Sequence, residues 1–484
     1  MPLRKLGASC AFAAAALALA AAASAAPVIG VTEDATKYGS DGGASLFRKM
    51  RDSGLASNRI AVFWDASRTD IFEKPFLDRT IPQATAAGIQ VVLSVYPLRA
   101  GTANASPAAT GRFCGYMALL ARTYPQVTTF IVGNEPNQPR FWQPQFDATG
   151  QPAAGAQYET LLATCYDALK AVNPGIDVIG LGLSNRGNDN PTAADNVSTS
   201  PIRFIHDVGA AYRASGRTAA IMDELSFHCY PNVNTDPLEK HYLWPNAGCA
   251  DLDRVKQAVW DAFAGTGQPT FAEAGTPTTG RPLTIVIDEV GWQVGVGGPG
   301  YYGQENVPVV DESTQARIYA GVVQLAECDP SISTVHFFHL LDEADLDRFQ
   351  SGLFRLNGTP RASAESVRAA AAAGCTTGPV AWTHSTRVAG AELKSVAGKW
   401  RVKAEEDATW SAAVYRIGGG RRLSARAAVA SATGRVSAYR SAPVVLPRRL
   451  RPGRYVRVVR LRATANPGRT TVLVGKRFRI LAGR

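Results

Sequence analysis

The chain has 484 residues, 46% of them hydrophobic, and its 51 Lys and Arg against 40 Asp and Glu give a formal net charge of +11. The excess is confined to residues 376–484, which hold 23 basic and 4 acidic side chains, whereas the preceding part is mildly acidic. A basic tail attracts polyanions. Because this tail lacks interleaved aromatic residues, the pattern argues against a nucleic-acid partner. It favours either an anionic cell-wall polymer or a merely solvated basic surface.

The first 25 residues have the pattern of a secretory signal peptide. Arg4 and Lys5 precede an Ala- and Leu-rich stretch over residues 8–23, and an A-x-A site ends at Ala25. These three features predict export and cleavage after Ala25. The alternative is a retained membrane anchor, although the apolar stretch is short for a span. No later segment reaches spanning length.

Between residues 27 and 375, short apolar runs alternate with segments that are apolar at helical spacing. Eight such runs, separated by helix-plus-loop distances, predict an α/β fold, a (β/α)8 TIM barrel with inserted loops. An open doubly wound sheet is the alternative. The eight runs are 28–31, 59–64, 90–96, 127–132, 176–183, 224–230, 284–290 and 334–341.

After Cys375 the sequence changes character. Residues 362–373 form an alanine-rich helical pattern, the last helix of the predicted barrel domain, and residues 376–378 resemble a linker. Short strand patterns separated by Gly and Pro turns then predict a small all-β, Ig-like sandwich over residues 379–484. The strand patterns are 400–404, 409–415, 454–461 and 470–480.

Six cysteines remain if Cys10 leaves with the signal peptide. An even number fits disulfide bonding in an oxidising compartment, and six cysteines allow fifteen connectivities. We expect sequential pairing. No C-x-x-C motif or His/Cys cluster is present, so we expect no metal site. The expected pairs are Cys114–Cys165, Cys229–Cys249 and Cys328–Cys375.

Two glutamates follow apolar runs at positions where a barrel enzyme carries its chemistry. Glu135 closes the run 127–132 through Gly133-Asn134, and Glu289 closes the run 283–287 through Asp288. The C-terminal ends of barrel strands form the catalytic face. Two carboxyl groups at one opening are what cleavage of a glycosidic bond needs. The alternative is that both are ordinary loop acids.

These motifs resemble those of clan A of the glycoside hydrolases, the retaining (β/α)8 enzymes, over residues 27–375. Gly133-Asn134-Glu135 is similar to the fourth-strand motif, and the resemblance implies that Glu135 is the acid/base and that Asn134 holds a sugar hydroxyl. Asp288-Glu289 is similar to the seventh-strand motif, which implies that Glu289 is the nucleophile. Side chains alternate along a strand, so we expect only one of these two acids to face the opening.

Two further strand ends carry the same resemblance. His228 and Tyr230 are similar to a sixth-strand pair, in which the tyrosine contacts the nucleophile. Arg59 is similar to the second-strand arginine that supports the carboxylates. For Arg59 a structural ion pair is the alternative role, and for His228 a place in the core.

Substrate contacts from the remaining loops are less well defined. Trp142 and Trp292 are candidate sugar platforms, because a flat apolar ring suits the C–H face of a pyranose. Where clan A enzymes place a tryptophan on the eighth strand, this chain has His336-Phe337-Phe338-His339, and His339 is a candidate substrate contact.

Together these features predict a secreted, monomeric glycosidase that cleaves a β-linked oligo- or polysaccharide with two glutamates and no cofactor. A non-catalytic glycan-binding protein is one alternative. A cell-surface protein dominated by its basic tail is the other. The sugar, the linkage and the mode of attack are left open.

Overall fold

The computed structural model describes residues 26–277, 280–396, 399–417, 428–446 and 450–481. The expected signal peptide, residues 1–25, lies outside these ranges. Within them, no helix has the length and apolar character that crossing a membrane requires.

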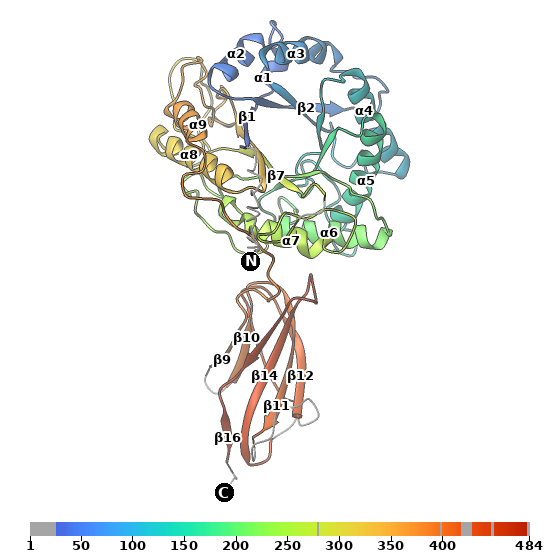
Figure 1. The fold of residues 1–484 in the computed structure, drawn as a ribbon, viewed down its shortest axis with the longest axis vertical. Helices are drawn as coiled ribbons and strands as arrows, with labels where there is room; N and C mark the ends of the chain where they lie inside the picture. The colour runs from blue at the N-terminus through green and yellow to red at the C-terminus, as the bar shows by residue number, and fades with distance from the viewer. Residues whose placement is uncertain (1–25, 278–279, 397–398, 418–427, 447–449, 482–484) are drawn as a thin grey trace, which may run out of the picture.

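The N-terminal part is a closed barrel of eight parallel strands (Figure 1), as the eight apolar runs predicted. The first strand pairs with the last, with Val28 opposite Thr334, which closes the sheet and rules out the open doubly wound alternative. The strands are β1 (Val28–Thr32), β2 (Ser57–Trp64), β3 (Gln90–Pro97), β4 (Thr129–Val132), β5 (Asp177–Ser184), β6 (Glu224–His228), β7 (Thr284–Val290) and β8 (Ile332–Phe338).

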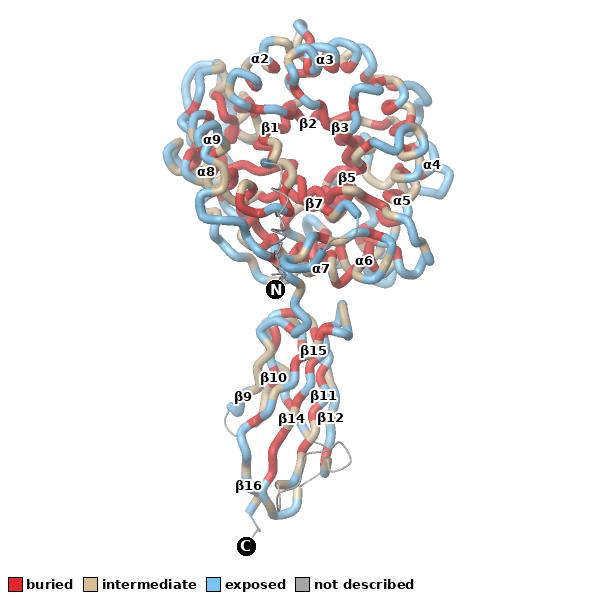
Figure 2. The backbone as a smooth tube through the Cα atoms, viewed as in Figure 1, coloured by how far each residue is buried: buried red, intermediate tan, exposed pale blue. Residues whose placement is uncertain are grey.

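Helices surround the strands, and the strand residues between them are mostly buried (Figures 1 and 2). A strand buried on both faces needs a near-continuous apolar sequence. For this reason the eight strands could be identified from the sequence as apolar runs. The helices are α1 (Ala35–Tyr38), α2 (Ala44–Asp52), α3 (Lys74–Ala87), α4 (Pro107–Thr123), α5 (Ala154–Val172), α6 (Pro201–Ser215), the 3₁₀ turn η1 (Cys249–Asp251), α7 (Leu252–Phe263), α8 (Glu312–Cys328) and α9 (Ala362–Ala373).

Three disulfides fasten neighbouring parts of the barrel domain, and their pairing is the expected one. The first joins α4 to α5, and the second joins the residue after β6 to η1. The third joins the last residue of α8 to Cys375, two residues beyond the end of α9. Each loop closure restricts the unfolded chain and contributes on the order of 2–4 kcal/mol to stability. The bonds are Cys114–Cys165, Cys229–Cys249 and Cys328–Cys375.

The C-terminal part is a β-sandwich of two antiparallel sheets, in the orders β13-β10-β9 and β12-β11-β14-β15, with β16 also paired to β14. The pattern 470–480 divides into two strands that pair with successive parts of β14. Three strands were missed by the sequence reading, namely β9, β12 and β13. The strands are β9 (Glu392–Val396), β10 (Lys399–Lys403), β11 (Ala408–Arg416), β12 (Ala428–Val436), β13 (Ser441–Pro443), β14 (Gly453–Ala463), β15 (Thr470–Val474) and β16 (Phe478–Ile480).

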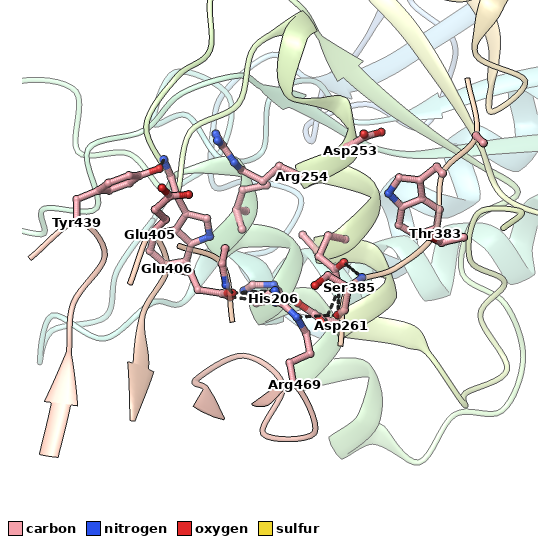
Figure 3. A pocket seen from close by; sticks show the side chains of 17 residues that line it. His206, Asp253, Arg254, Asp261, Thr383, Ser385, Glu405, Glu406, Tyr439 and Arg469 are labelled. Atoms are coloured by element: carbon pink, nitrogen blue, oxygen red, sulfur yellow. Dashed lines mark hydrogen bonds and ion pairs between the residues drawn. The ribbon is translucent and has the colours of Figure 1, made fainter. Parts of the chain in front are cut away.

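The sandwich meets the barrel beside α6 and α7 (Figure 1), and a buried arginine joins the two parts. Arg469, 4% exposed, binds Asp261 of α7 at 2.8 Å and Glu406 of the sandwich at 2.7 Å. A cavity of about 420 Å³ lies beside this network, and His206 and Tyr439 are among its lining residues (Figure 3).

Candidate active site

The first glutamate sits in a turn at the C-terminal end of β4. Gly133 has φ 87° and Glu135 has φ 37°, so the chain reverses sharply within three residues of the strand end. The Glu135 amide donates to the carbonyl of Gly182 at 2.8 Å, which ties the turn to the end of β5. A positive φ is unfavourable for a residue other than glycine, by roughly 1–3 kcal/mol, and strain of this kind is common at functional sites.

The second glutamate lies at the end of β7 and is bound by two donors. Arg59 Nη1 is 2.7 Å from Glu289 Oε1, and the Tyr230 hydroxyl donates to Glu289 Oε2 at 2.9 Å. The resemblance to clan A motifs implied both donors. Arg59 also donates to Asn134 and to Ser94 Oγ, so one guanidinium links β2, β3, the β4 turn and β7.

Burial lowers the pKa of Arg59, but the charges of Glu289 and Asp288 outweigh it, and the guanidinium pKa is raised. The Tyr230 pKa is raised well above its ordinary value by burial and by the neighbouring Glu289 carboxylate. Both groups therefore hold their protons and act as donors toward Glu289.

A single histidine nitrogen brings the two glutamates together. His228 Nδ1 lies 2.9 Å from Glu135 Oε1 and 3.5 Å from Glu289 Oε2. The two carboxyl groups therefore face the same ring nitrogen, and these two oxygens can be no farther apart than the two distances combined. His228 is buried and touches both acids, so it is part of the site.

Asp288, next to Glu289 in the chain, is fully buried. Its carboxylate accepts from Ser226 Oγ, lies 3.2 Å from His228 Nε2, and lies 3.5 Å from Arg59 Nε. Burial would raise its pKa, but His228, Arg59 and Ser226 hold the pKa of this carboxyl well below its usual range. Burial likewise works against the charged form of His228. The pKa of His228 is nevertheless raised well above its usual range, because it faces Glu289, Asp288 and Glu135.

The expectation that alternation would separate Asp288 from Glu289 holds only in part. Glu289 is 8% exposed and Asp288 is 0% exposed, so only Glu289 reaches the opening. Both acids nevertheless contact Arg59 and His228. The reason is a register slip of β7 against β6 and β8 near these residues, which interrupts the regular alternation.

The two tryptophans do not have the exposure that a sugar platform requires. Trp142 is 4% exposed and packs edge-on against Tyr158 in the core. Trp292 is 2% exposed, and its indole N–H donates to the carbonyl of Asp236. Because a platform must present a ring face to the ligand, the structure corrects both expectations and assigns these residues to packing.

His339 follows β8. Its Nδ1 lies 2.7 Å from the Thr32 carbonyl, and its side chain is 12% exposed. This placement leaves its expected substrate contact a prediction. The neighbouring Phe338 packs edge-on against Tyr230 and Phe349, so phenylalanine rings flank the tyrosine that binds Glu289.

Sequence reasoning missed three polar residues that support the site. Ser94 and Ser226 contact Arg59 and Asp288, and their signal was a small hydroxyl inside an apolar strand run. Glu33 follows β1 directly, so the strand-end rule that identified Glu135 also identifies it. Burial raises the pKa of Glu33, whose carboxylate accepts from the amides of Leu340 and Leu341. It thereby joins the ends of β1 and β8.

Among the residues that the structure describes, no group of three or more His, Cys, Asp or Glu side chains is arranged to hold a metal ion. The site consists instead of three carboxyl groups, one guanidinium, one imidazole and one phenol. Such a site can offer a proton donor and an anionic nucleophile to the two atoms of one substrate bond.

No family model matches the chain, and no curated protein matches it. Among solved structures, the chain is similar to a family 39 glycoside hydrolase from Bacteroides cellulosilyticus WH2, with 15% identity, TM-score 0.48, and coverage of 87% of this chain and 81% of that one. It is also similar to a GH5_18 from Bifidobacterium longum subsp. infantis, with 14% identity, TM-score 0.47, and coverage of 73% and 80%.

A third similar structure is a GH5_18 from Streptomyces cattleya in complex with GlcNAc, with 15% identity, TM-score 0.47, and coverage of 75% of this chain and 83% of that chain. All three are distant from this chain, and we base its proposed function on the geometry of the site.

Proposed function

We propose that the chain is an exported glycoside hydrolase that cleaves a β-linked glycan by a retaining mechanism. The observation that carries this proposal is the position of Glu135 and Glu289, both within 3.5 Å of His228 Nδ1 at the C-terminal opening of a TIM barrel. The resemblance of four strand-end motifs to clan A enzymes supports the same activity. The three disulfides support export, because such bonds persist in oxidising compartments.

In the first step, a Glu289 oxygen forms a bond to the anomeric carbon as the glycosidic C–O bond breaks. Glu135 gives its proton to the leaving oxygen. Arg59 and Tyr230 orient Glu289 for the attack, and Asn134, held by Arg59, faces the sugar.

In the second step, Glu135 takes a proton from water as the water oxygen attacks the anomeric carbon. Glu289 leaves as a carboxylate, and the product keeps the anomeric configuration of the substrate.

The test is product analysis on a panel of β-linked polysaccharides with the wild-type chain and two variants. We expect Glu289→Gln to abolish turnover while oligosaccharide binding persists. Glu135→Gln should lose roughly 10²–10⁴ in rate, with the smallest loss on substrates that have good leaving groups. Glu365→Gln changes an exposed acid of α9 and serves as the control with normal activity.

The anomer formed first, followed by ¹H NMR, reports the stereochemistry. Release of the inverted anomer, or normal kinetics in either active-site variant, contradicts the mechanism. Saturable binding without released reducing ends favours the alternative, a glycan-binding protein on a barrel scaffold.

A further inference from the structure

The five-stranded sheet of the sandwich carries a group of exposed arginines on its outer face. Along β14, Arg454, Arg460 and Arg462 are exposed, whereas the intervening Val459 and Leu461 are buried. Side chains two residues apart on a strand share a face, with a spacing of about 7 Å. The arginines of β14 therefore point to solvent, and the valine and leucine point to the core between the sheets.

Strand pairing extends this face sideways. Thr409 of β11 is paired with Arg435 of β12 on one side and with Arg462 of β14 on the other. Arg479 of β16 lies directly opposite Arg454 of β14. Directly opposed residues on antiparallel strands point to the same side of the sheet. Arg435 and Arg462 are thus two strand spacings apart, roughly 10 Å. We name this set the arginine face: Arg435, Arg454, Arg460, Arg462 and Arg479.

No carboxylate of the sandwich balances these charges. Its sequence has four acids, and all four lie elsewhere: Glu392 on β9 beside Lys394, Glu406 on Arg469, Asp407 on Arg203, and Glu405 in the cavity at the junction. Among the described residues, none of the five arginines forms an ion pair.

Arg454 and Arg479 add an energetic argument. Like charges directly opposite one another on neighbouring strands are destabilising. A sheet selected for stability alone does not favour this pair, whereas a surface that binds anions does. The arginine face is therefore arranged for an external partner at some cost in stability.

The neighbours of the arginines indicate the kind of anion. Thr409, Ser411 and Thr433 lie between them and offer hydroxyl groups. Of the aromatic residues, Tyr415 shares this face, whereas single-stranded nucleic acids are bound by successive aromatic platforms. A guanidinium binds a carboxylate through two parallel N–H donors. Guanidinium groups with hydroxyl groups between them suit an extended, acidic sugar chain.

We propose that the arginine face binds a linear anionic polysaccharide and so holds the barrel at a charged glycan matrix. This surface lies on the sandwich and does not depend on the catalytic assignment. Binding is salt-sensitive, because the contacts are exposed ion pairs.

The experiment measures binding of the full-length Glu289→Gln chain to polygalacturonate, so that cleavage cannot interfere. The test variant is the triple R435Q/R460Q/R462Q. The control is the triple K394Q/K399Q/K403Q, which removes the same charge from exposed positions on the other sheet. We expect the arginine triple to weaken binding roughly tenfold or more, since each exposed pair contributes modestly. The lysine triple should change it less than about threefold.

Three further measurements make the outcome decisive. Fully methyl-esterified polygalacturonate should bind poorly, and added salt should weaken binding of the free acid. The single variant R462Q should show a smaller loss of the same kind if the triple does not fold. Equal losses in both triples, tighter binding to a single-stranded DNA oligonucleotide or to anionic vesicles, or no binding at low salt would overturn the proposal. Each of these outcomes leaves the glycosidase test unaffected.

Discussion

At the scale of single residues, the site is an arrangement of charges around His228. The imidazole faces Glu135 from the turn after β4 and Asp288 and Glu289 from β7. Tyr230 donates to Glu289, and Arg59 pairs with both β7 acids. Two cations, Arg59 and His228, thus lie among the three carboxyl groups. Asp288 is fully buried, and we expect it to act through His228 as a positioning residue.

Asp288→Asn should lower the pKa of His228, because it removes a buried negative charge that lies 3.2 Å from Nε2. In the wild type, the raised pKa keeps the imidazolium as pH rises past about 6.5, the ordinary histidine value, and its contribution is lost only near the higher folded-state pKa. In the variant, His228 should lose its proton at a lower pH, and the alkaline limb of the activity profile should move to lower pH with it.

Imidazole ¹⁵N shifts of labelled histidine measure this directly, with His228→Gln to assign the signal. Asp329→Asn breaks another buried carboxylate–cation pair, with Lys256, and is the matched control. An unchanged titration of His228 in Asp288→Asn would rule out the positioning role.

At the scale of elements, α6 packs tightly on α5 and carries an acid in an unfavourable position. The Cβ position of Gly155 on α5 is 2.5 Å from Asp207 Cβ, so the helices meet with no room for a larger side chain. Burial, reinforced by Asp189, raises the pKa of Asp207 to about 7. The folded state therefore holds a proton that the unfolded state releases between pH of about 4 and 7, and stability falls as pH rises through this range.

Asp207→Asn should remove this penalty, because asparagine has the shape of the protonated acid. We expect the free energy of unfolding to rise by roughly 1–3 kcal/mol above pH 7. This increase should vanish below about pH 4, where the wild-type carboxyl group is protonated in both states. Chemical denaturation at several pH values measures the change. Asp167→Asn, at a mostly exposed position on α5, should have a small effect at every pH. A destabilised Asp207→Asn at pH 8 would contradict the assignment.

At the scale of the whole molecule, barrel and sandwich are joined by buried and half-buried ion pairs. Arg469 reaches both Asp261 and Glu406, and its guanidinium also donates to the carbonyls of Ser385 and Arg387 in the connecting segment. Arg203 adds a more exposed pair with Asp407 across the same junction. Coupling between the barrel and the sandwich should depend on the contacts of Arg469 far more than on the Arg203–Asp407 pair.

Arg469→Gln should cost about 3–5 kcal/mol, because it leaves two buried carboxylates without their cation. Arg203→Gln should cost about 0–1 kcal/mol. Differential scanning calorimetry measures both, and the Arg469 variant should separate the barrel and sandwich transitions. Proteolysis of the segment before β9 should also become faster. A single unshifted transition in Arg469→Gln would show that the junction does not couple the two parts.

By itself, the sequence determined the barrel and the position of both glutamates, whereas the sequential disulfide pairing was one of fifteen connectivities that it allowed. Strands buried on both faces must be apolar along their length, and parallel strands place their C-terminal ends together, so Glu135 and Glu289 could be assigned to one opening from strand order alone. The strands of the sandwich were harder to identify, because half-buried strands such as β12 have weak patterns.

Only the tertiary structure decided which side chains are exposed and which charges meet. Trp142 and Trp292 are of the residue type that forms sugar platforms, but the packing of the chain buries both side chains in the core. Asp288 joins the charge cluster through a local register slip, and the arginine face depends on pairing between strands far apart in the chain. Contacts of this kind arise from the packing of distant segments, which no local pattern records.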